Sequence, residues 1–268
     1  MTISLFTKKL LSLSLTATAA GVGVISSVVP AQAYLIYFGE DINGDPNVPL
    51  ASFPNASDAE ADFLSNLQGV GTEDFEGFSA GTGTPLNLTF PGSTGNITAT
   101  LSGGGGTIDS VPVGQTNGAG RYATSGTNFF EVDAGSSNNF EVTFDSPVAA
   151  FGFYGVDIGD FGGQLQLELT NGTTQTVTVP NTGGSNGSTD GSVLFYGIVA
   201  ENSSQTFTSV SFLTTTGQGD IFAFDDFTVG DLDQVVPPPP GTPEPASMLG
   251  LLAVGALGAG SALKRKRN

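Results

Sequence analysis

The sequence predicts an all-β fold, an antiparallel β-sandwich of two sheets with one short helix. Between residues 34 and 236 the chain is rich in Gly, Thr, Ser and Asn and poor in Leu and Ala, which argues against helices. In the same span short apolar runs alternate with turn residues, as they do in β-sandwiches. About 200 residues are enough for one domain with its own core. A closed barrel is the alternative architecture.

The second half of this span carries the clearest strand patterns. Residues 165–169 alternate Leu with Gln or Glu, Asn171-Gly172 predicts a type I′ turn, and residues 177–179 continue a returning strand. Residues 149–154 form a continuous apolar run, which predicts a strand buried on both faces. Further strands are expected at residues 140–144, 193–199, 207–213 and 221–229.

One helix is expected near the start of the domain. Ser57-Asp58-Ala59-Glu60 matches a capping box, which places the start of the helix at Ser57. Phe63, Leu64 and Leu67 follow at spacings that give one apolar face, and Gly69 ends the helix. Two loops are expected, a Gly-rich one at residues 103–120 and a second at residues 181–191.

The first 33 residues predict a signal peptide. Lys8 and Lys9 precede a run of apolar and small residues, and Pro30-Ala31-Gln32-Ala33 has the small-x-small form that signal peptidase accepts. Cleavage is expected after Ala33, so that the domain spans residues 34–236. An uncleaved N-terminal anchor is the alternative, but Ser, Thr and Gly interrupt the run and no charged stop-transfer flank follows it.

The other end of the chain has a three-part pattern. A Pro-rich linker at residues 237–242 leads to Pro243-Glu244-Pro245, then to an uncharged Gly- and Ala-rich stretch at residues 246–263, and then to basic residues. The stretch is about long enough to cross a membrane as a helix, with the basic end in the cytoplasm. This ending resembles the PEP-CTERM sorting signal over residues 243–268. The resemblance implies that an exosortase recognises Pro243, Glu244 and Pro245, removes the tail, and releases a membrane-anchored intermediate to the cell surface or the outside.

Two segments of the domain also resemble the bodies of many PEP-CTERM proteins. They are Glu73-Asp74-Phe75-Glu76-Gly77-Phe78 and Phe222-Ala223-Phe224-Asp225-Asp226-Phe227. The resemblance implies a jelly-roll or lectin-like sandwich and no established activity.

The domain is strongly acidic. Of the 25 Asp and Glu residues only Glu244 lies outside residues 34–236, and of the 7 Lys and Arg residues only Arg121 lies inside, which leaves 24 acids, one base and a net charge of −23. Nucleic acid is excluded as a partner, because phosphate binding needs clustered Lys and Arg. The sequence has no Cys and no His, which excludes thiolate zinc sites and His-based catalysis.

A carboxylate pair could still cleave a glycosidic bond. Glu131-Val132-Asp133 begins the Glu-x-Asp-x-x-Glu pattern of some β-sandwich glycosidases, but Ser136 stands where the third carboxylate is needed. The sequence therefore predicts a protein that is not an enzyme, with Glu131 and Asp133 as an exposed strand pair.

Calcium is the expected cofactor, in a structural role, because it prefers carboxylate and carbonyl oxygens from loops between strands. The candidate ligands are Asp74 and Glu76 near the start of the domain and Asp225 and Asp226 near its end. First and last strands are often neighbours in lectin-like sandwiches, so these four side chains are expected to converge. Asp157 and Asp160 form a second candidate pair. The alternative for both groups is a set of solvated carboxylates.

Sugar binding usually uses exposed aromatic rings, and the chain has no Trp. Arg121 and Tyr122 are the candidate ligand-binding residues, because they stand together at the end of the Gly-rich loop. Arg121 is expected to bind either an acidic polysaccharide or, in the favoured alternative, a carboxylate of its own domain.

The function that these patterns predict is that of an exported, non-enzymatic surface or matrix protein that binds calcium and associates with exopolysaccharide. A carbohydrate-binding module is the first alternative. An ice-binding or adhesive surface is the second, suggested by Thr173, Thr174, Thr176 and Thr178, although Thr is common in strands.

Overall fold

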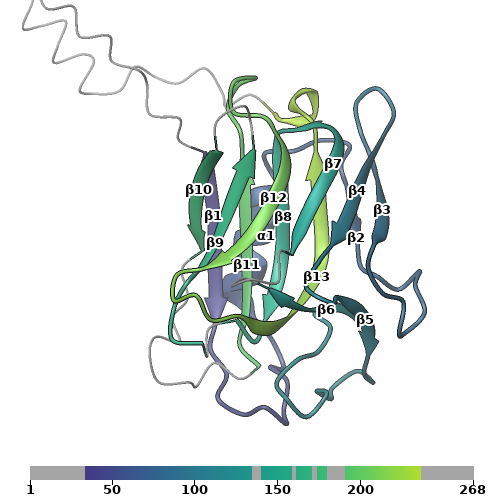
Figure 1. Cartoon of the computed structure of the whole chain (residues 1–268), viewed down its shortest axis with the longest axis vertical. Coiled ribbons are helices and arrows are strands. Elements are labelled where there is room, and N and C mark those ends of the chain that lie inside the picture. Colours follow the sequence, from purple (N-terminus) through teal and green to yellow (C-terminus); the bar gives the residue numbers. More distant parts are fainter. Residues whose placement is uncertain (1–33, 135–139, 159–160, 171–173, 180–190, 237–268) are drawn as a thin grey trace, which may run out of the picture. The chain divides into compact units, whose positions relative to one another are not determined.

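Two antiparallel sheets pack face to face in the computed structural model, which describes residues 34–134, 140–158, 161–170, 174–179 and 191–236 (Figure 1). In spatial order the seven-stranded sheet contains β1 (Leu35–Asp41), β11 (Val193–Val199), β8 (Ala150–Val156), β13 (Asp220–Gly230), β6 (Asn128–Ala134) and β5 (Thr107–Ser110), and β2 (Gly71–Glu73) also pairs with β13. The six-stranded sheet contains β10 (Thr174–Val179), β9 (Leu165–Thr170), β12 (Phe207–Thr214), β7 (Glu141–Val148), β4 (Asn96–Ser102) and β3 (Leu86–Pro91). The predicted two-sheet sandwich is therefore confirmed.

Burial along each strand follows from what covers its two faces. In β3 and β4 buried and more exposed positions alternate, because one face of the six-stranded sheet packs on the core and the other faces outward. Every residue of β8 and of β11 is buried, because the seven-stranded sheet is covered on both faces. The prediction of a doubly buried strand over residues 149–154 is confirmed.

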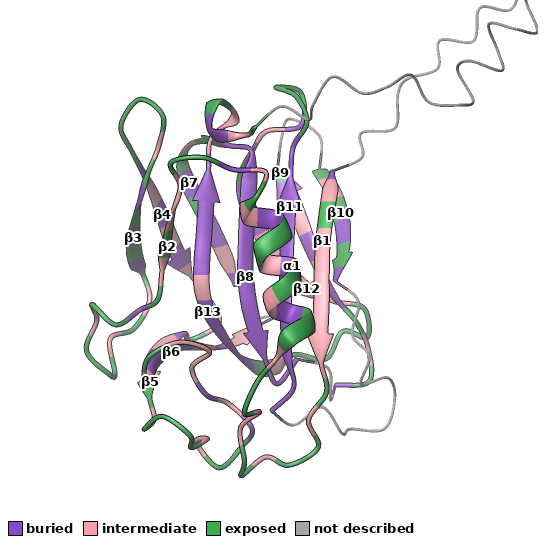
Figure 2. Ribbon diagram, turned by 180° about the vertical axis from the view of Figure 1, so that it is seen from behind, coloured by how far each residue is buried: buried purple, intermediate pink, exposed green. Residues whose placement is uncertain are grey.

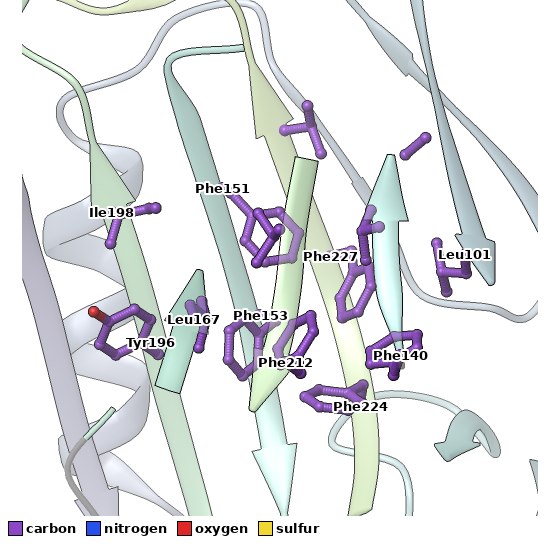
Figure 3. Packing of buried hydrophobic residues seen from close by; sticks show 14 of the residues in the cluster. Leu101, Phe140, Phe151, Phe153, Leu167, Tyr196, Ile198, Phe212, Phe224 and Phe227 are labelled. Carbon is purple, nitrogen blue, oxygen red and sulfur yellow. The ribbon is translucent and has the colours of Figure 1, made fainter. Parts of the chain in front are cut away.

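Phenylalanine side chains fill the space between the sheets (Figure 3). The ring centroids of Phe140 and Phe212 are 4.8 Å apart in a stacked arrangement, and those of Phe153 and Phe224 are 5.3 Å apart in an edge-to-face one. These rings come from both sheets, so they join the two layers. Aromatic pairs in such geometries stabilise a core beyond the area that they bury.

A second apolar cluster lies between the seven-stranded sheet and helix α1 (Pro54–Leu64), which packs on the outer face of that sheet (Figure 2). Phe63 of the helix is fully buried there. Its ring lies over Gly152 of β8 and Gly197 of β11, where an added Cβ atom would be 2.7 and 2.6 Å from the ring. The two glycines inside otherwise apolar strands therefore make room for the helix.

The helix begins earlier than the sequence predicts. It starts at Pro54, so Ser57 lies inside its first turn and the predicted capping box does not form. Asp41, at the end of β1, takes the capping role: its carboxylate accepts hydrogen bonds from the backbone N–H groups of Asn55 at 3.4 Å and Ala56 at 2.9 Å. Glu60 instead accepts a hydrogen bond from the hydroxyl of Tyr154 at 2.8 Å.

Two of the predicted connections differ in the structure. The hairpin of β9 and β10 is confirmed with Leu165 opposite Val179, although its turn at residues 171–173 lies outside the described residues. The expected loop at residues 103–120 contains strand β5, which pairs with β6. Most of the expected loop at residues 181–191 lies outside the described residues.

The predicted signal peptide, linker, sorting motif and membrane helix also lie outside the described residues. Within the ranges that the structure describes, no helix combines the length and the apolar character that crossing a membrane requires. A short 3-10 helix (Leu232–Gln234) follows β13 and closes the described domain.

Candidate functional site

A loop of residues 111–127, here called the acid-bound loop, lies on the outer face of the seven-stranded sheet between β5 and β6. Most of the side chains that the sequence nominated for a site contact it. The pairing of β2 with β13, with Glu73 opposite Phe227, brings the start of the domain next to its end. The predicted approach of these two segments is therefore confirmed.

Asp225 and Asp226 hold the middle of the acid-bound loop. Asp225 Oδ2 accepts hydrogen bonds from the backbone N–H groups of Thr124 at 2.7 Å and Ser125 at 3.1 Å, and from the Thr124 hydroxyl at 2.9 Å. Asp226 accepts hydrogen bonds from the hydroxyls of Ser125 at 3.0 Å and Thr124 at 3.3 Å. The two neighbouring carboxylates can reach one loop because a bulge interrupts the strand pairing here and Asp226 has a φ of 49°.

Glu76 holds the end of the same loop. Its Oε1 atom accepts hydrogen bonds from the backbone N–H groups of Thr127 and Asn128, both at 2.6 Å. These two donors hold the pKa of Glu76 below its usual value. Asp74, in contrast, bonds only locally, accepting from the backbone N–H of Glu76 at 3.1 Å.

The four predicted calcium ligands are thus close to one loop but do not point at one centre. Asp74 and Glu76 do not share a strand face, because β2 ends at Glu73 and Phe75 has a φ of 58°. No group of three or more acidic side chains suited to a metal occurs in the described part of the chain. Backbone N–H groups of the loop bind the Asp225 and Glu76 carboxylates, which were expected to bind a cation.

Burial raises the pKa values of both Asp225 and Asp226. The Asp225 carboxyl is fully buried, and its pKa lies well above its usual value because of desolvation and then of the charge of Asp226. The pKa of Asp226 is raised to about 6, first by desolvation, with further contributions from the charges of Glu60 and Asp74. The two carboxyl groups therefore influence each other's titration, and each keeps its proton to a higher pH than an ordinary Asp side chain.

Arg121, which precedes the Thr124-Ser125 segment of the acid-bound loop, is bound inside the domain. Its Nε lies 2.7 Å from Glu131 Oε2 and its Nη1 lies 3.2 Å from Asp157 Oδ2. Nη1 also donates to the backbone carbonyl of Ile221 at 3.3 Å. The favoured prediction of an internal partner is confirmed, and the expectation that Glu131 is simply an exposed strand residue is corrected. The partner of Asp157 in the second predicted calcium pair, Asp160, lies outside the described residues.

Tyr122 does not offer a ring for stacking. It is only 4% exposed, and its hydroxyl donates to the backbone carbonyl of Gly191 at 2.8 Å and accepts from the backbone N–H of Leu50 at 3.1 Å. Burial raises its pKa to about 12. The expectation of an exposed binding residue is corrected, because the Tyr122 side chain belongs to the second apolar cluster.

The outer face of the six-stranded sheet is a second candidate surface, and the sequence alone does not reveal it as a whole. No described element packs on this face, which is turned toward the viewer in Figure 1. One side chain from each strand forms a line across it. This line, here called the hydroxyl row, consists of Asn87, Thr100, Thr143, Ser209, Thr170 and Thr174. Ser209 is buried within the row, and the other five side chains are partly or fully exposed.

The register of the strands defines the hydroxyl row. Thr100 stands opposite both Asn87 and Thr143, and Thr143 stands opposite Ser209. The hydroxyls of Ser209 and Thr170 are 3.1 Å apart, and the Thr100 hydroxyl donates to Asn87 at 2.9 Å. With strands about 4.8 Å apart, the row crosses about 24 Å of sheet without a charge. Only the Thr alternation in residues 173–178 signals it in the sequence, because the other members come from strands far apart in the chain.

Neither a protein-family model nor a curated protein sequence matches the chain. Among solved structures it is similar to the K2 cleaved adhesin domain of Lys-gingipain, with 15% identity, a TM-score of 0.37, and coverage of 60% of this chain and 97% of that one. It is similar to the CBM22-1 xylan-binding domain of Paenibacillus barcinonensis Xyn10C, with 17% identity, a TM-score of 0.32, and coverage of 60% and 99%. It is also similar to a family 29 carbohydrate-binding module, with 12% identity, a TM-score of 0.28, and coverage of 52% and 89%. These values are too low to identify a family or a ligand.

Proposed function

We propose that this chain is a non-catalytic binding domain of the cell surface or extracellular matrix, which binds carbohydrate through the outer face of its six-stranded sheet. The observation that carries the proposal is the uncharged hydroxyl row across all six strands of that sheet. In a domain with a net charge of −23, an uncharged line of this length is a distinct feature of this face, which also carries Glu141 and Glu168.

The chemistry of the row suits a polyhydroxylated polymer. Each Thr or Ser hydroxyl is both a donor and an acceptor, and the Asn87 amide adds both kinds of group. A polysaccharide presents hydroxyls of the same dual character along its length. Hydrogen bonds to a rigid sheet are made without ordering a loop, which lowers the entropic cost of binding.

Single domains are expected to bind weakly. The exposed large apolar side chains among the described residues are all aliphatic, and the hydroxyl row contains no aromatic ring that could stack on a sugar. Hydrogen bonds that replace bonds to water contribute only about 1 kcal/mol each. We therefore expect a dissociation constant on the order of 1 mM, equivalent to about 4 kcal/mol, and stronger retention when many copies are displayed together.

Replacing Thr100 and Thr143 together by Val is expected to lower the affinity for neutral polysaccharides about tenfold, because two central hydroxyls of the row are removed while the strand shape is kept. Affinity electrophoresis of the full chain through gels that contain xylan, mannan or β-glucan measures the loss. Thr107→Val is the matched control, because Thr107 lies on β5 of the other sheet. Equal retention of the double variant and the parent chain would contradict the proposal.

A row of hydroxyls across a sheet also suits an ice surface, the other use of Thr-bearing strands that the sequence suggests. The same double variant separates the two ligands. Thermal hysteresis by the parent chain that is lost in Thr100→Val with Thr143→Val, without binding to any polysaccharide, would replace carbohydrate by ice as the ligand.

Delivery to the surface is part of the proposal and is supported by the sequence alone. The predicted signal peptide and the Pro243-Glu244-Pro245 tail predict signal peptidase and an exosortase as processing partners. Both segments lie outside the described residues.

Calcium binding near Asp226 stays a prediction, supported by the acidic side chains of Glu60 and Asp74 that act on it. The melting temperature of the full chain is expected to rise by several degrees from EGTA to millimolar calcium, because a ligand of the folded state adds stability by mass action. Asp225→Asn with Asp226→Asn should abolish the rise, and Asp58→Asn on the exposed side of α1 should leave it intact. An unchanged melting temperature in the parent chain would contradict the prediction of calcium binding.

A further inference from the structure

We propose that the carbohydrate bound at the six-stranded sheet carries amino groups, and that Glu141 and Glu168 hold one ammonium group between them. This inference rests on the proposed function and names the class of polymer that the face selects. It follows from the row of side chains next to the hydroxyl row, which differs from it in charge.

Strand register places the two carboxylates on one line. Ser211 of β12 stands opposite Glu168 of β9 on one side and opposite Glu141 of β7 on the other. Their neighbours along the strands, such as Val142 and Leu169, are buried in the core, so both Glu side chains belong to the outer face. The two strands that bear them are about 10 Å apart, with Ser211 between them.

A hollow of about 370 Å³ lies at this place and is lined by Glu141, Glu168, Ser211 and Leu213 together with Phe140 and Phe212. A small hydroxyl at Ser211 between two longer acidic side chains leaves room above the middle strand. Leu213, which is only partly buried, adds an apolar patch at the edge of the hollow. A sugar ring has an apolar face and a polar rim, and this lining offers a partner to each.

The charge of the hollow is not neutralised by the domain. Arg121 is the only cation of residues 34–236, and its ion pairs are with Glu131 and Asp157 on the other sheet. No Lys or Arg of the domain is therefore left for Glu141 or Glu168. A cation that pairs with these two carboxylates must therefore come from outside the domain, and a cationic ligand can supply it.

An ammonium group on a hexosamine fits these requirements better than the other charged groups of polysaccharides. It has donors for both carboxylates and for the Ser211 hydroxyl, and opposite charge favours its approach. Uronic acids would be repelled by both carboxylates. An N-acetylated hexosamine would keep the hydrogen-bonding hydroxyls but would lose the charge.

The test compares a glucosamine hexamer with its N-acetylated counterpart by calorimetry on the full chain, in a mildly acidic buffer in which the amines are protonated. The free hexamer is expected to bind about tenfold more tightly, which corresponds to about 1.4 kcal/mol. Glu141→Gln and Glu168→Gln should each abolish this preference. Both variants should keep their affinity for the neutral polysaccharides, which rests on the hydroxyl row.

Asp58→Asn is the matched control, because it removes the same charge from an exposed position of α1, the helix that packs on the other sheet. A loss of preference in Asp58→Asn equal to that in the Glu variants would overturn the inference, since general attraction to an acidic domain would then explain it. Equal affinity for the two hexamers, with both lost in Thr100→Val with Thr143→Val, would overturn the inference and leave the proposed function standing. Failure to bind the hexamers and every neutral polysaccharide would overturn both. Calcium-dependent binding of a uronate polymer that requires Glu141 and Glu168 would also overturn it.

Discussion

Replacing Arg121 by Met is expected to lower the free energy of unfolding by about 3 kcal/mol, the low end of what breaking a buried ion pair costs. Arg121 is 14% exposed, Asp157 5% and Glu131 25%, so the pair with Asp157 is the more buried of its two ion pairs. Met keeps much of the length and apolar stem of Arg. The loss is therefore assigned to the two carboxylates that are left without their cation.

The position of Arg121 makes its replacement more severe than that of an ordinary surface cation. No other Lys or Arg exists between residues 34 and 236, so no neighbouring cation can take over. Arg121 also connects the acid-bound loop to β6 through Glu131 and to the start of β13 through the carbonyl of Ile221. Loss of these contacts should free this part of the loop as well as destabilise the domain.

Urea unfolding of the parent chain and of Arg121→Met measures the difference. Arg121→Met combined with Glu131→Gln and Asp157→Asn is the informative control, because it removes the unpaired charges and Asn tolerates the φ of 67° at position 157. Most of the lost stability should return in the triple variant. A single variant within about 1 kcal/mol of the parent chain would mean that the contact is a surface ion pair of ordinary strength.

Internal pairing of Arg121 was predictable because a lone cation among 24 acids finds a carboxylate in its own domain. Which carboxylates bind Arg121 was not predictable, since Asp157 and Glu131 come from a loop and a strand that only the sheet order brings together. The same reason hid the hydroxyl row, whose members are spread from Asn87 to Ser209. The balance of charges can be counted from the composition, whereas the residues that share a surface depend on the register of the strands.

The fold could be predicted where periodicity is strong. The alternation at residues 165–169 and the apolar run at residues 149–154 gave the correct strands, because burial on one or two faces imposes these patterns directly. The start of α1 could not be found in this way. A capping box is a local signal, and the Asp41 carboxylate reaches the helix only because β1 ends beside it. Strand β5 was hidden for a similar reason, because pairing with β6 stabilises a Gly-flanked segment of four residues.

Carboxylates near a turn predict a metal site well only when their oxygens lack donors. Here the backbone N–H groups of Thr124 and Ser125 donate to Asp225, and those of Thr127 and Asn128 donate to Glu76, so two of the four nominated side chains already have backbone donors. A sequence does not show which way a Gly- and Thr-rich loop turns its N–H groups. The proximity of the segments was therefore predictable, and their contacts were not.

The free energy of unfolding is expected to fall by about 3 kcal/mol as the pH rises from about 4 to about 7, because of the pKa of Asp226. That pKa lies at about 6 in the folded domain and near 3.8 in the unfolded chain. Between these two values the folded state keeps a proton that the unfolded state has released. Stability therefore decreases as the pH rises through this window, and the raised pKa of Asp225 acts in the same direction.

Carboxylates with lowered pKa values determine how the free energy of unfolding changes on the acidic side of the pH profile. The pKa of Glu76 is lowered by the N–H groups of Asn128 and Thr127, and that of Asp145 is lowered first by the N–H of Thr98. Their contributions are present above the unfolded values of about 4.5 and 3.8 and are lost as the pH falls through the folded ones. The domain should consequently be most stable in mildly acidic solution rather than at neutral pH.

Urea unfolding at a series of pH values, in parent chain and in Asp226→Asn, measures the contribution of this carboxyl. The general repulsion of an acidic domain also grows with pH, but salt screens charges in water far more than buried ones. At high salt the parent chain should keep most of its decrease toward neutral pH. Asp226→Asn should lose the part of the decrease that comes from Asp226 and be the more stable of the two at pH 7. Asp58→Asn should follow the parent chain. A parent profile that rises toward pH 7 would mean that the hydrogen bonds from Thr124 and Ser125 outweigh the desolvation of the pair, so that Asp225 and Asp226 are ionised in the folded domain and bind the loop as anions.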